Sequence, residues 1–167
     1  AGTTYNEPFH IARKLASLDY ISRGRAAWNV VTGHTAETAL NFGRPQHPAH
    51  HERYAMAEEF VDVVKLLWDS WEESGLLWDK KSGVKFDPAK LHPIRFKGKV
   101  YSVEGHLSIP RPPQGHPVIV QAGSSESAKE LAARTAEVIF TIQASMQSSQ
   151  RFYQDVKNRM RKYGRSP

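Results

Sequence analysis

The stretch Pro117-Val-Ile-Val-Gln-Ala-Gly-Ser-Ser-Glu-Ser-Ala-Lys-Glu130 joins a short apolar run to the first turn of a predicted helix. The run ends at Gly123, and Ser124 and Ser125 follow at once. Such a junction of strand and helix is typical of a parallel α/β protein, in which ligands bind at the carboxyl ends of the strands. The start of a helix there offers unpaired N–H groups and a positive dipole end.

Two interpretations of this serine pair follow from the local sequence. The first is a phosphate site, because serine hydroxyls add donors at little steric cost and a glycine lets the backbone approach a ligand closely. The second is an ordinary helix start, for which Ser127 and Glu130 form an acceptable capping box.

The same alternation of strand and helix extends along the chain in both directions. Hydrophobic periodicity and turn residues predict the elements. The first part of the chain is predicted to form a helix from Pro8 to Gly24, a buried strand over 26–32 and a long helix through Tyr54 and Trp71. An irregular segment over 74–93 follows, and then a hairpin with arms 96–103 and 106–109 that turns at Glu104-Gly105. The last part is predicted to form a strand over 118–121, a helix over 125–136, a strand over 137–142 and a final helix carrying Phe152 to Tyr163. The fold class is therefore α/β with a parallel sheet, and periodicity alone leaves open whether the sheet is doubly wound or part of a barrel.

Composition narrows the class of protein. The 167 residues are 40% apolar and 24% charged, which is typical of a globular protein, and no apolar run reaches the length of a membrane span. The absence of cysteine excludes disulfides and thiolate metal sites and suits a cytoplasmic protein. The net charge of +6 is spread along the chain apart from residues 157–165, which disfavours a nucleic-acid surface. The opening Ala1 to Tyr5 lacks an initiator methionine and reads as the end of a strand, so we expect a piece of a longer protein.

Three histidines, His47, His50 and His51, lie within five residues of one another. They could form a metal site in a loop, although the zinc-protease pattern fails because position 55 is alanine. They could also be solvated. A third interpretation pairs His50 with Tyr54 on one face of the helix start, where both could donate hydrogen bonds to an anionic ligand. Arg53 in the same turn is expected to form solvated salt bridges.

Further polar residues are predicted at strand ends. Asn29 follows Trp28 inside an apparently buried strand, where an amide needs a hydrogen-bond partner. Thr3 and Thr4 lie at the end of the first strand fragment, at the same edge of the predicted sheet as the end of the strand that contains Asn29. Because these residues, the histidine–tyrosine pair and the serine pair all occupy strand ends or helix starts, we expect one shared site.

Three segments together resemble a known family. They are "TTYNEPFHIARKLASLDYISRGRAAWNVVT", "HHERYAMAEEFVDVVKLLWDSWE" and "PVIVQAGSSESAKELAARTAEVIF". In order and spacing they resemble the bacterial luciferase-like flavin-dependent monooxygenases, most of all the branch of nitrilotriacetate monooxygenase component A, the sulfone monooxygenases and long-chain alkane monooxygenase. The resemblance implies that the chain is the central portion of a TIM-type (β/α)8 barrel, a single partial domain over 1–167 with an insertion at about 74–116 that includes the hairpin.

The resemblance also implies an activity. Family members use reduced FMN, which a separate NAD(P)H:flavin oxidoreductase supplies, and O2 to oxidise a small organic substrate through a flavin C4a-(hydro)peroxide. Position by position it implies cofactor contacts for Thr3 or Thr4, Asn29, His50, Tyr54, Ser124 and Ser125, with the serines at the phosphate. It assigns no catalytic residue and no metal, and it implies a dimer or tetramer. Residues 1–167 alone are not expected to turn over.

Two other functions stay open at this point. One is a metal-dependent hydrolase built on His47, His50 and His51. The other is a binding module that keeps the flavin-family fold without its chemistry.

Overall fold

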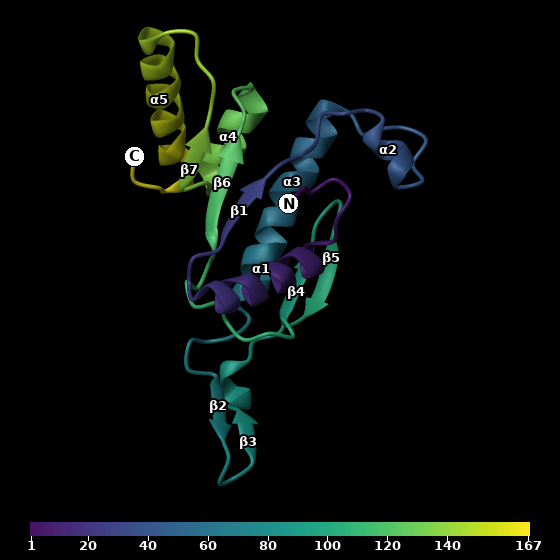
Figure 1. Cartoon of the computed structure of the whole chain (residues 1–167), viewed down its shortest axis with the longest axis vertical. Coiled ribbons are helices and arrows are strands. Elements are labelled where there is room, and N and C mark those ends of the chain that lie inside the picture. Colours follow the sequence, from purple (N-terminus) through teal and green to yellow (C-terminus); the bar gives the residue numbers. More distant parts are fainter. The chain divides into compact units, whose positions relative to one another are not determined.

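The computed structural model describes all residues from Ala1 to Pro167. Its elements are α1 (Pro8–Ser22), β1 (Ala27–Val30), α2 (Thr38–Asn41), α3 (His50–Asp69), β2 (Leu76–Asp79), β3 (Val84–Phe86), the 3-10 turn η1 (Pro88–Lys90), β4 (Ile94–Lys97), β5 (Ser102–Gly105), β6 (Val118–Ala122), α4 (Glu126–Thr135), β7 (Val138–Phe140), α5 (Met146–Met160) and the 3-10 turn η2 (Arg161–Tyr163) (Figure 1). None of the helices combines the length and the hydrophobicity needed to cross a membrane.

The chain divides into two compact units. The first comprises Ala1–Tyr5, Trp28–Glu58 and Val118–Pro167, and the second comprises Asn6–Ala27 and Glu59–Pro117. The long helix α3 contributes its first half to one unit and its second half to the other. Each unit is described in turn.

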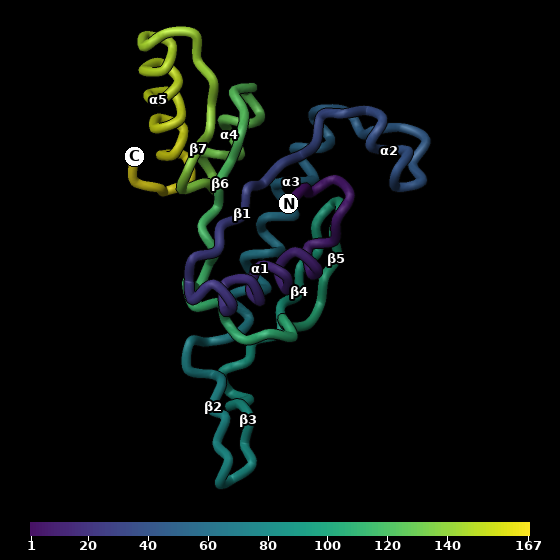
Figure 2. Tube along the Cα trace, viewed as in Figure 1, coloured from purple at the N-terminus to yellow at the C-terminus, as the bar shows by residue number.

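The first unit is built on a three-stranded sheet in the order β1-β6-β7. The strands β6 and β7 are parallel, and Val120, Gln121 and Ala122 lie opposite Val138, Ile139 and Phe140. A parallel bridge joins Gly2 to Val31, and the Thr3 N–H donates to the Val31 carbonyl at 2.9 Å. The predicted α/β class with parallel pairing is confirmed, because each parallel connection passes through a helix, as the path from β6 through α4 to β7 shows (Figure 2).

The helices α4 and α5 of this unit pack together (Figure 1). Arg159 on α5 donates to Asp155 on its own helix at 2.7 Å and to Glu130 on α4 at 3.0 Å. Arg165, beyond η2, donates to the carbonyls of Ala132, Ala133 and Ala136. The Ala132 carbonyl also accepts the Ala136 N–H at 2.9 Å, whereas the carbonyls of Ala133 and of the C-cap residue Ala136 lie where α4 ends, so the guanidinium caps the end of the helix.

The core of the second unit forms around α1 and the second half of α3. The Trp68 indole N–H donates to the Ala12 carbonyl at 3.1 Å, and that of Trp71 donates to the Leu107 carbonyl at 2.7 Å. Asp19 on α1 is fully buried, and its carboxylate accepts hydrogen bonds from the backbone N–H groups of Ala26 and Gln114 and from the Gln114 side chain. These bonds fix the end of α1 to the segment that leads into β6.

The second unit carries two antiparallel hairpins where the sequence predicts one. In the hairpin β4–β5, Ile94 lies opposite Gly105 and Lys97 lies opposite Ser102. The predicted turn at Glu104-Gly105 is therefore wrong, since both residues belong to β5 and the chain turns at 98–101. The Glu59 carboxylate of α3 explains the difference, because it accepts the N–H groups of Lys99, Val100 and Tyr101 in that turn at 2.8 to 3.1 Å.

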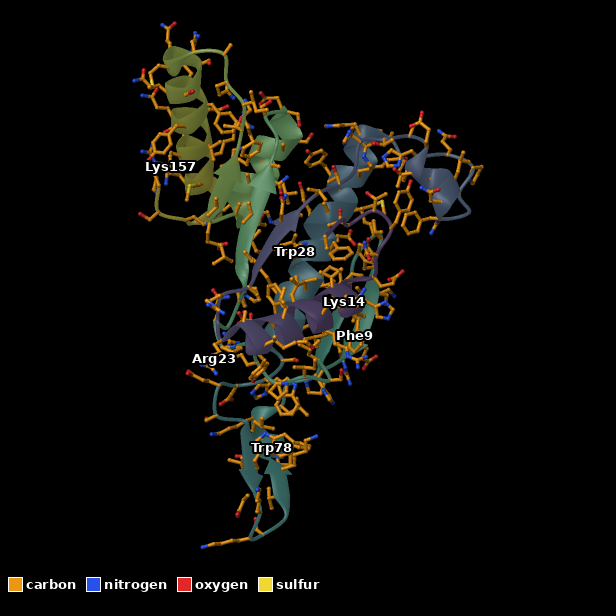
Figure 3. The ribbon with its side chains drawn as sticks, in the orientation of Figure 1. Phe9, Lys14, Arg23, Trp28, Trp78 and Lys157 are labelled. Atoms are coloured by element: carbon orange, nitrogen blue, oxygen red, sulfur yellow. The ribbon has the colours of Figure 1, made fainter.

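The segment 74–93, predicted to be irregular, contains the hairpin β2–β3 and the turn η1. Trp78 on β2 (Figure 3) is exposed and has φ of 49°, and the Lys85 ammonium lies 5.1 Å from the centroid of its ring. A cation–π pair across a short hairpin depends on which residues of the two strands lie near each other. The glycines and prolines of this segment gave no indication of that pairing.

Three smaller predictions are also corrected. The strand β1 alternates exposed and buried residues instead of being buried on both faces, and Asn29 lies on its exposed face. The short helix α2 lies between the predicted strand over 26–32 and the predicted long helix, where the sequence indicated no element. The helix α4 is capped by Ser125 rather than Ser127, because the Ser125 hydroxyl accepts the Ala128 N–H at 3.2 Å.

Candidate functional site

An open pocket of about 430 Å³ lies in the first unit, at the carboxyl ends of its strands. Four segments line it: the residues after β1 (Val31, Thr32, Gly33 and His34), the start of α3 (His50, Arg53 and Tyr54), the end of β6 and the loop to α4 (Gln121, Ala122, Gly123 and Ser124), and the end of β7 with the two residues after it (Phe140, Thr141 and Ile142). This is the edge of a parallel sheet at which ligands bind in α/β proteins.

Three of the predicted site residues meet in this pocket: His50, Tyr54 and Ser124. The rings of His50 and Tyr54 have centroids 4.8 Å apart and planes inclined by 41°, as expected for side chains one turn apart on a helix. The Tyr54 side chain is largely buried, and its hydroxyl oxygen lies 3.9 Å from where a Cβ on Gly123 would be. The start of α3 and the loop after β6 therefore approach each other at the wall of the pocket.

Gly123 has a conformation that only glycine adopts readily. Its φ is 129°, and an added Cβ would lie 3.1 Å from the Cβ of Ala128. The absence of a side chain leaves the backbone between β6 and α4 accessible from the pocket. The sequence expectation that a glycine here permits close approach therefore has a steric basis in the structure.

Ser125 does not line the pocket but caps α4. Its oxygen accepts the Ala128 N–H, and its hydroxyl hydrogen is still able to donate to a ligand. The first turn of α4 contains one acidic residue, Glu126, which would oppose an anion. Hydrogen bonds from Lys129 and Arg159 hold the pKa of Glu126 below its usual value, and these two cations neutralise its charge.

Thr3, Thr4 and Asn29 do not line the pocket. The two threonine hydroxyls donate to backbone carbonyls, that of Thr3 to Val31 at 3.5 Å and that of Thr4 to Thr32 at 2.6 Å. The Asn29 carbonyl accepts the N-terminal ammonium at 2.9 Å, and its side chain lies on the exposed face of β1. Contact of these three residues with a cofactor stays a prediction.

Two functional candidates were missed. Arg53 was expected to be solvated and salt-bridged, which is wrong: it is only 9% exposed, lines the pocket and takes part in no ion pair of the structure. Gln121, the polar residue in the run Val118–Ala122, is 1% exposed and also lines the pocket. A signal for Gln121 was present, since a lone amide in a buried strand needs a partner. For Arg53 the only signal was its position one turn after His50.

The histidine cluster does not form a metal site. No group of three histidine, aspartate or glutamate side chains in the structure could hold a metal ion. The His47 Nδ1 lies 2.6 Å from the Tyr5 hydroxyl, and the Tyr5 ring stacks on Phe42. The proposed hydrolase site of His47, His50 and His51 therefore has no support in the geometry, because His47 and His50 pair with different tyrosines.

Comparison with known proteins gives a consistent picture. The family model for luciferase-like monooxygenases matches residues 2–167. The N-acetyl-S-(2-succino)cysteine monooxygenase of Bacillus subtilis is 56% identical over 167 residues, which are all of this chain and 38% of that protein. Nitrilotriacetate monooxygenase component A of Aminobacter aminovorans is 57% identical over 166 residues, which are 99% of this chain and 37% of that protein.

A solved structure agrees with these relatives. The crystal structure of a riboflavin lyase with modified FMN and the substrate riboflavin superimposes with a TM-score of 0.93 at 39% identity, covering 99% of this chain and 37% of that one. The chain thus spans a little over a third of the length of the relatives it matches. The match covers nearly every residue and confirms the resemblance found in the three sequence segments, so the chain belongs to the luciferase-like monooxygenase family.

Proposed function

We propose that the intact protein containing this chain is the oxygenating component of a two-component monooxygenase, which uses reduced FMN and O2 to oxidise a small organic substrate. The observation that carries the proposal is the pocket at the strand ends, which includes Ser124, two residues before α4. Its lining combines polar groups of His50, Arg53, Tyr54 and Ser124 with the apolar side chains of Val31, Phe140 and Ile142. A flavin nucleotide likewise combines an anionic tail with an aromatic ring system.

The residues present fit the tail of FMN. The phosphate would lie at the first turn of α4, where Ser124 and Ser125 supply hydroxyls, the helix supplies N–H groups and Gly123 leaves room. His50 and Tyr54, whose rings lie side by side, would donate to the same end of the nucleotide. Thr3, Thr4 and Asn29 are proposed as contacts on the side of the first strands.

The apolar part of the pocket has a different task. The side chains of Phe140 and Ile142 are largely exposed in this chain and would cover one side of the flavin ring. When bound, reduced FMN supplies the two electrons with which one atom of O2 enters the substrate and the other leaves as water, with oxygen activated at the C4a position. The share of these residues is to hold the ring and keep water away from it.

The whole-protein architecture follows from the same proposal. A (β/α)8 barrel of which this chain forms the central, partial domain accounts for the parallel strands and for a chain spanning about a third of its relatives. The two hairpins would belong to an insertion at about 74–116. A small carboxylate-bearing amine or thioether is the substrate class that the names of the two relatives favour, and the net charge of +6 suits an anion.

FMN binding to the intact protein tests this function. We expect saturable binding of one FMN per chain, followed as quenching of flavin fluorescence, and oxidation of nitrilotriacetate or N-acetyl-S-(2-succino)cysteine when a flavin reductase is present. Tyr54→Phe and His50→Gln should each weaken FMN binding by about 1 kcal/mol, the usual value of one hydrogen bond. His51→Gln is the matched control, since His51 is exposed next to His50 but does not line the pocket.

Three results would contradict the proposal. The absence of flavin binding at millimolar FMN would show that FMN is not the cofactor. Binding of FMN without oxidation of any amine, sulfide, sulfone or alkane would favour a binding module. Stoichiometric zinc or iron held by the histidines would revive the hydrolase.

A further inference from the structure

Two buried polar atoms in the pocket have no hydrogen-bond partner. One is Nε of Arg53, on the first turns of α3, and the other is Oε1 of Gln121, in β6. Their residues are 9% and 1% exposed, and both line the pocket of about 430 Å³. Apart from these two atoms, only Nε2 of His47 is unpaired among the buried side-chain polar atoms of the chain.

Both side chains are held in place by their other polar ends. The Arg53 guanidinium donates through one terminal nitrogen to the Pro48 carbonyl at 2.6 Å. The Gln121 amide donates from Nε2 to the Ala122 carbonyl at 3.3 Å. These bonds leave Nε of Arg53 and Oε1 of Gln121 as the unsatisfied groups. Native proteins contain few such groups, and each calls for a ligand, a water molecule or a functional reason.

The two orphan atoms have opposite hydrogen-bonding character. Arg53 is permanently charged and can only donate, so Nε needs an acceptor and favours an anionic oxygen. The oxygen of Gln121 can only accept, so it needs a hydroxyl or an N–H group. Arg53 is in none of the ion pairs found in the structure and its Nε has no hydrogen-bond partner, which leaves its charge for a ligand. An inorganic phosphate would supply an acceptor for Arg53 alone. A phosphorylated polyol supplies both an anionic acceptor for Arg53 and a hydroxyl donor for Gln121.

We propose that Arg53 and Gln121 are specificity-determining residues that read the two parts of the flavin's tail. Arg53 binds the phosphate and so distinguishes FMN from riboflavin, and Gln121 accepts a hydrogen bond from a ribityl hydroxyl, which FMN and riboflavin share. This assignment rests on the proposed FMN function and adds two residues that sequence reasoning did not place in the site. Because both side chains are already fixed by the protein, binding costs little side-chain entropy.

Three flavins test the assignment by equilibrium titration of the intact protein: FMN, riboflavin, and lumiflavin, which lacks the ribityl chain. Arg53→Gln should weaken FMN binding roughly 10- to 100-fold, the usual effect of losing a charged hydrogen bond, and leave riboflavin binding within about twofold. Gln121→Leu should weaken FMN and riboflavin equally, by roughly three- to tenfold, and leave lumiflavin unchanged. Arg44→Gln, an exposed arginine of the same unit that does not line the pocket, is the control and should alter none of these affinities.

The outcomes separate this inference from the proposed function. If the unaltered protein binds no flavin, the proposed function fails. If it binds FMN but Arg53→Gln weakens FMN and riboflavin by the same factor, Arg53 is structural and the inference is overturned while the function stands. Equal weakening of lumiflavin by Gln121→Leu overturns the second assignment in the same way.

Arg53→Lys covers the possibility that Arg53→Gln does not fold, which its melting curve would show. Lysine keeps the positive charge but has no N–H group at the position of Nε, so Arg53→Lys should weaken FMN binding and leave riboflavin binding within about twofold. Equal weakening of the two flavins overturns the assignment of Arg53.

Discussion

At the scale of single residues, two adjacent serines have different tasks. Ser125 is the N-cap of α4, whereas Ser124 lines the pocket and makes no side-chain hydrogen bond to the helix. Substitutions at the two serines should therefore differ in their effect on the stability of the fold. We expect Ser125→Ala to lower the free energy of unfolding by about 1 kcal/mol through loss of the cap. Ser124→Ala should change it by less than about 0.5 kcal/mol.

Both substitutions should weaken FMN binding, by about 1–3 kcal/mol each, since each removes a donor to the phosphate. Ser125→Asp is the informative control: it restores the cap and therefore the stability, but its charge repels the phosphate. Urea unfolding and FMN titration on the same samples give the two readouts. An FMN affinity that Ser124→Ala leaves unchanged would remove Ser124 from the site.

Residue-level prediction brought residues to one pocket where local chemistry sets position. Ser124, His50 and Tyr54 line the same pocket because a strand end or a helix start fixes where such residues lie, and their contact with a cofactor stays a prediction. Arg53 was missed because an arginine in a polar turn is usually solvated, and only tertiary packing buries it. Asn29 was predicted to be buried and is exposed. The reason is that the sequence of a short, largely apolar strand does not show which of its two faces is covered.

At the scale of elements, the contact between α4 and α5 should make the stability of the first unit depend on pH. Glu130 accepts hydrogen bonds from Lys162, Tyr163 and Arg159, which lower the pKa of its carboxyl from 4.5 to about 2. Arg159 and Lys129 likewise lower the pKa of Asp155 from 3.8 to about 2. Both carboxylates are ionised more readily in the folded state, so they stabilise it at neutral pH.

The sign of the effect gives the test. The stabilisation is complete above about pH 5 and should be lost as the pH falls through 4.5 toward 2. Glu130→Gln should cost roughly 1 kcal/mol at pH 7 and only a small part of that at pH 2, as measured from urea midpoints. Glu104→Gln is the control, because its pair with Arg95 is 71% and 86% exposed and should contribute little. A constant deficit from pH 7 to pH 2 would contradict the assignment.

The order and type of the main elements were predictable because their hydrophobic periods differ. The number of hairpins and the positions of their turns were not predictable. Glu59 fixes the turn of β4–β5 from a different element, 40 to 42 residues away in sequence, and no local pattern contains that information. The hairpin β2–β3 lacks regular alternation and contains an irregularity between Leu76 and Asp79, so period 2 is not visible in it.

At the scale of the whole molecule, alternation of strands and helices predicted the parallel α/β class but not its closure. Barrel and open sheet share the same local pattern and differ only in how distant strands meet. The resemblance of three sequence segments carried the family, which the comparisons confirmed. A site at the strand ends was expected, but the two unpaired polar atoms of the pocket were not predictable from either, because they follow from packing that no single segment encodes.

The source of reducing equivalents is also a question at this scale. One relative is named as component A of its enzyme, and two further relatives are named as the two different polypeptides of pristinamycin IIA synthase. These names indicate relatives that work with a further polypeptide. Under the proposed function, reduced FMN would reach this protein as a free ligand, and the protein itself would need no nicotinamide.

We therefore expect photoreduced FMN, mixed with the intact protein, substrate and O2 in the absence of NAD(P)H, to give up to one product per reduced flavin. Omission of the protein is the control, since free reduced flavin reacts with O2 without oxidising the substrate. A requirement for NAD(P)H in this mixture would mean that the protein reduces its own flavin, and the partner reductase would have no role.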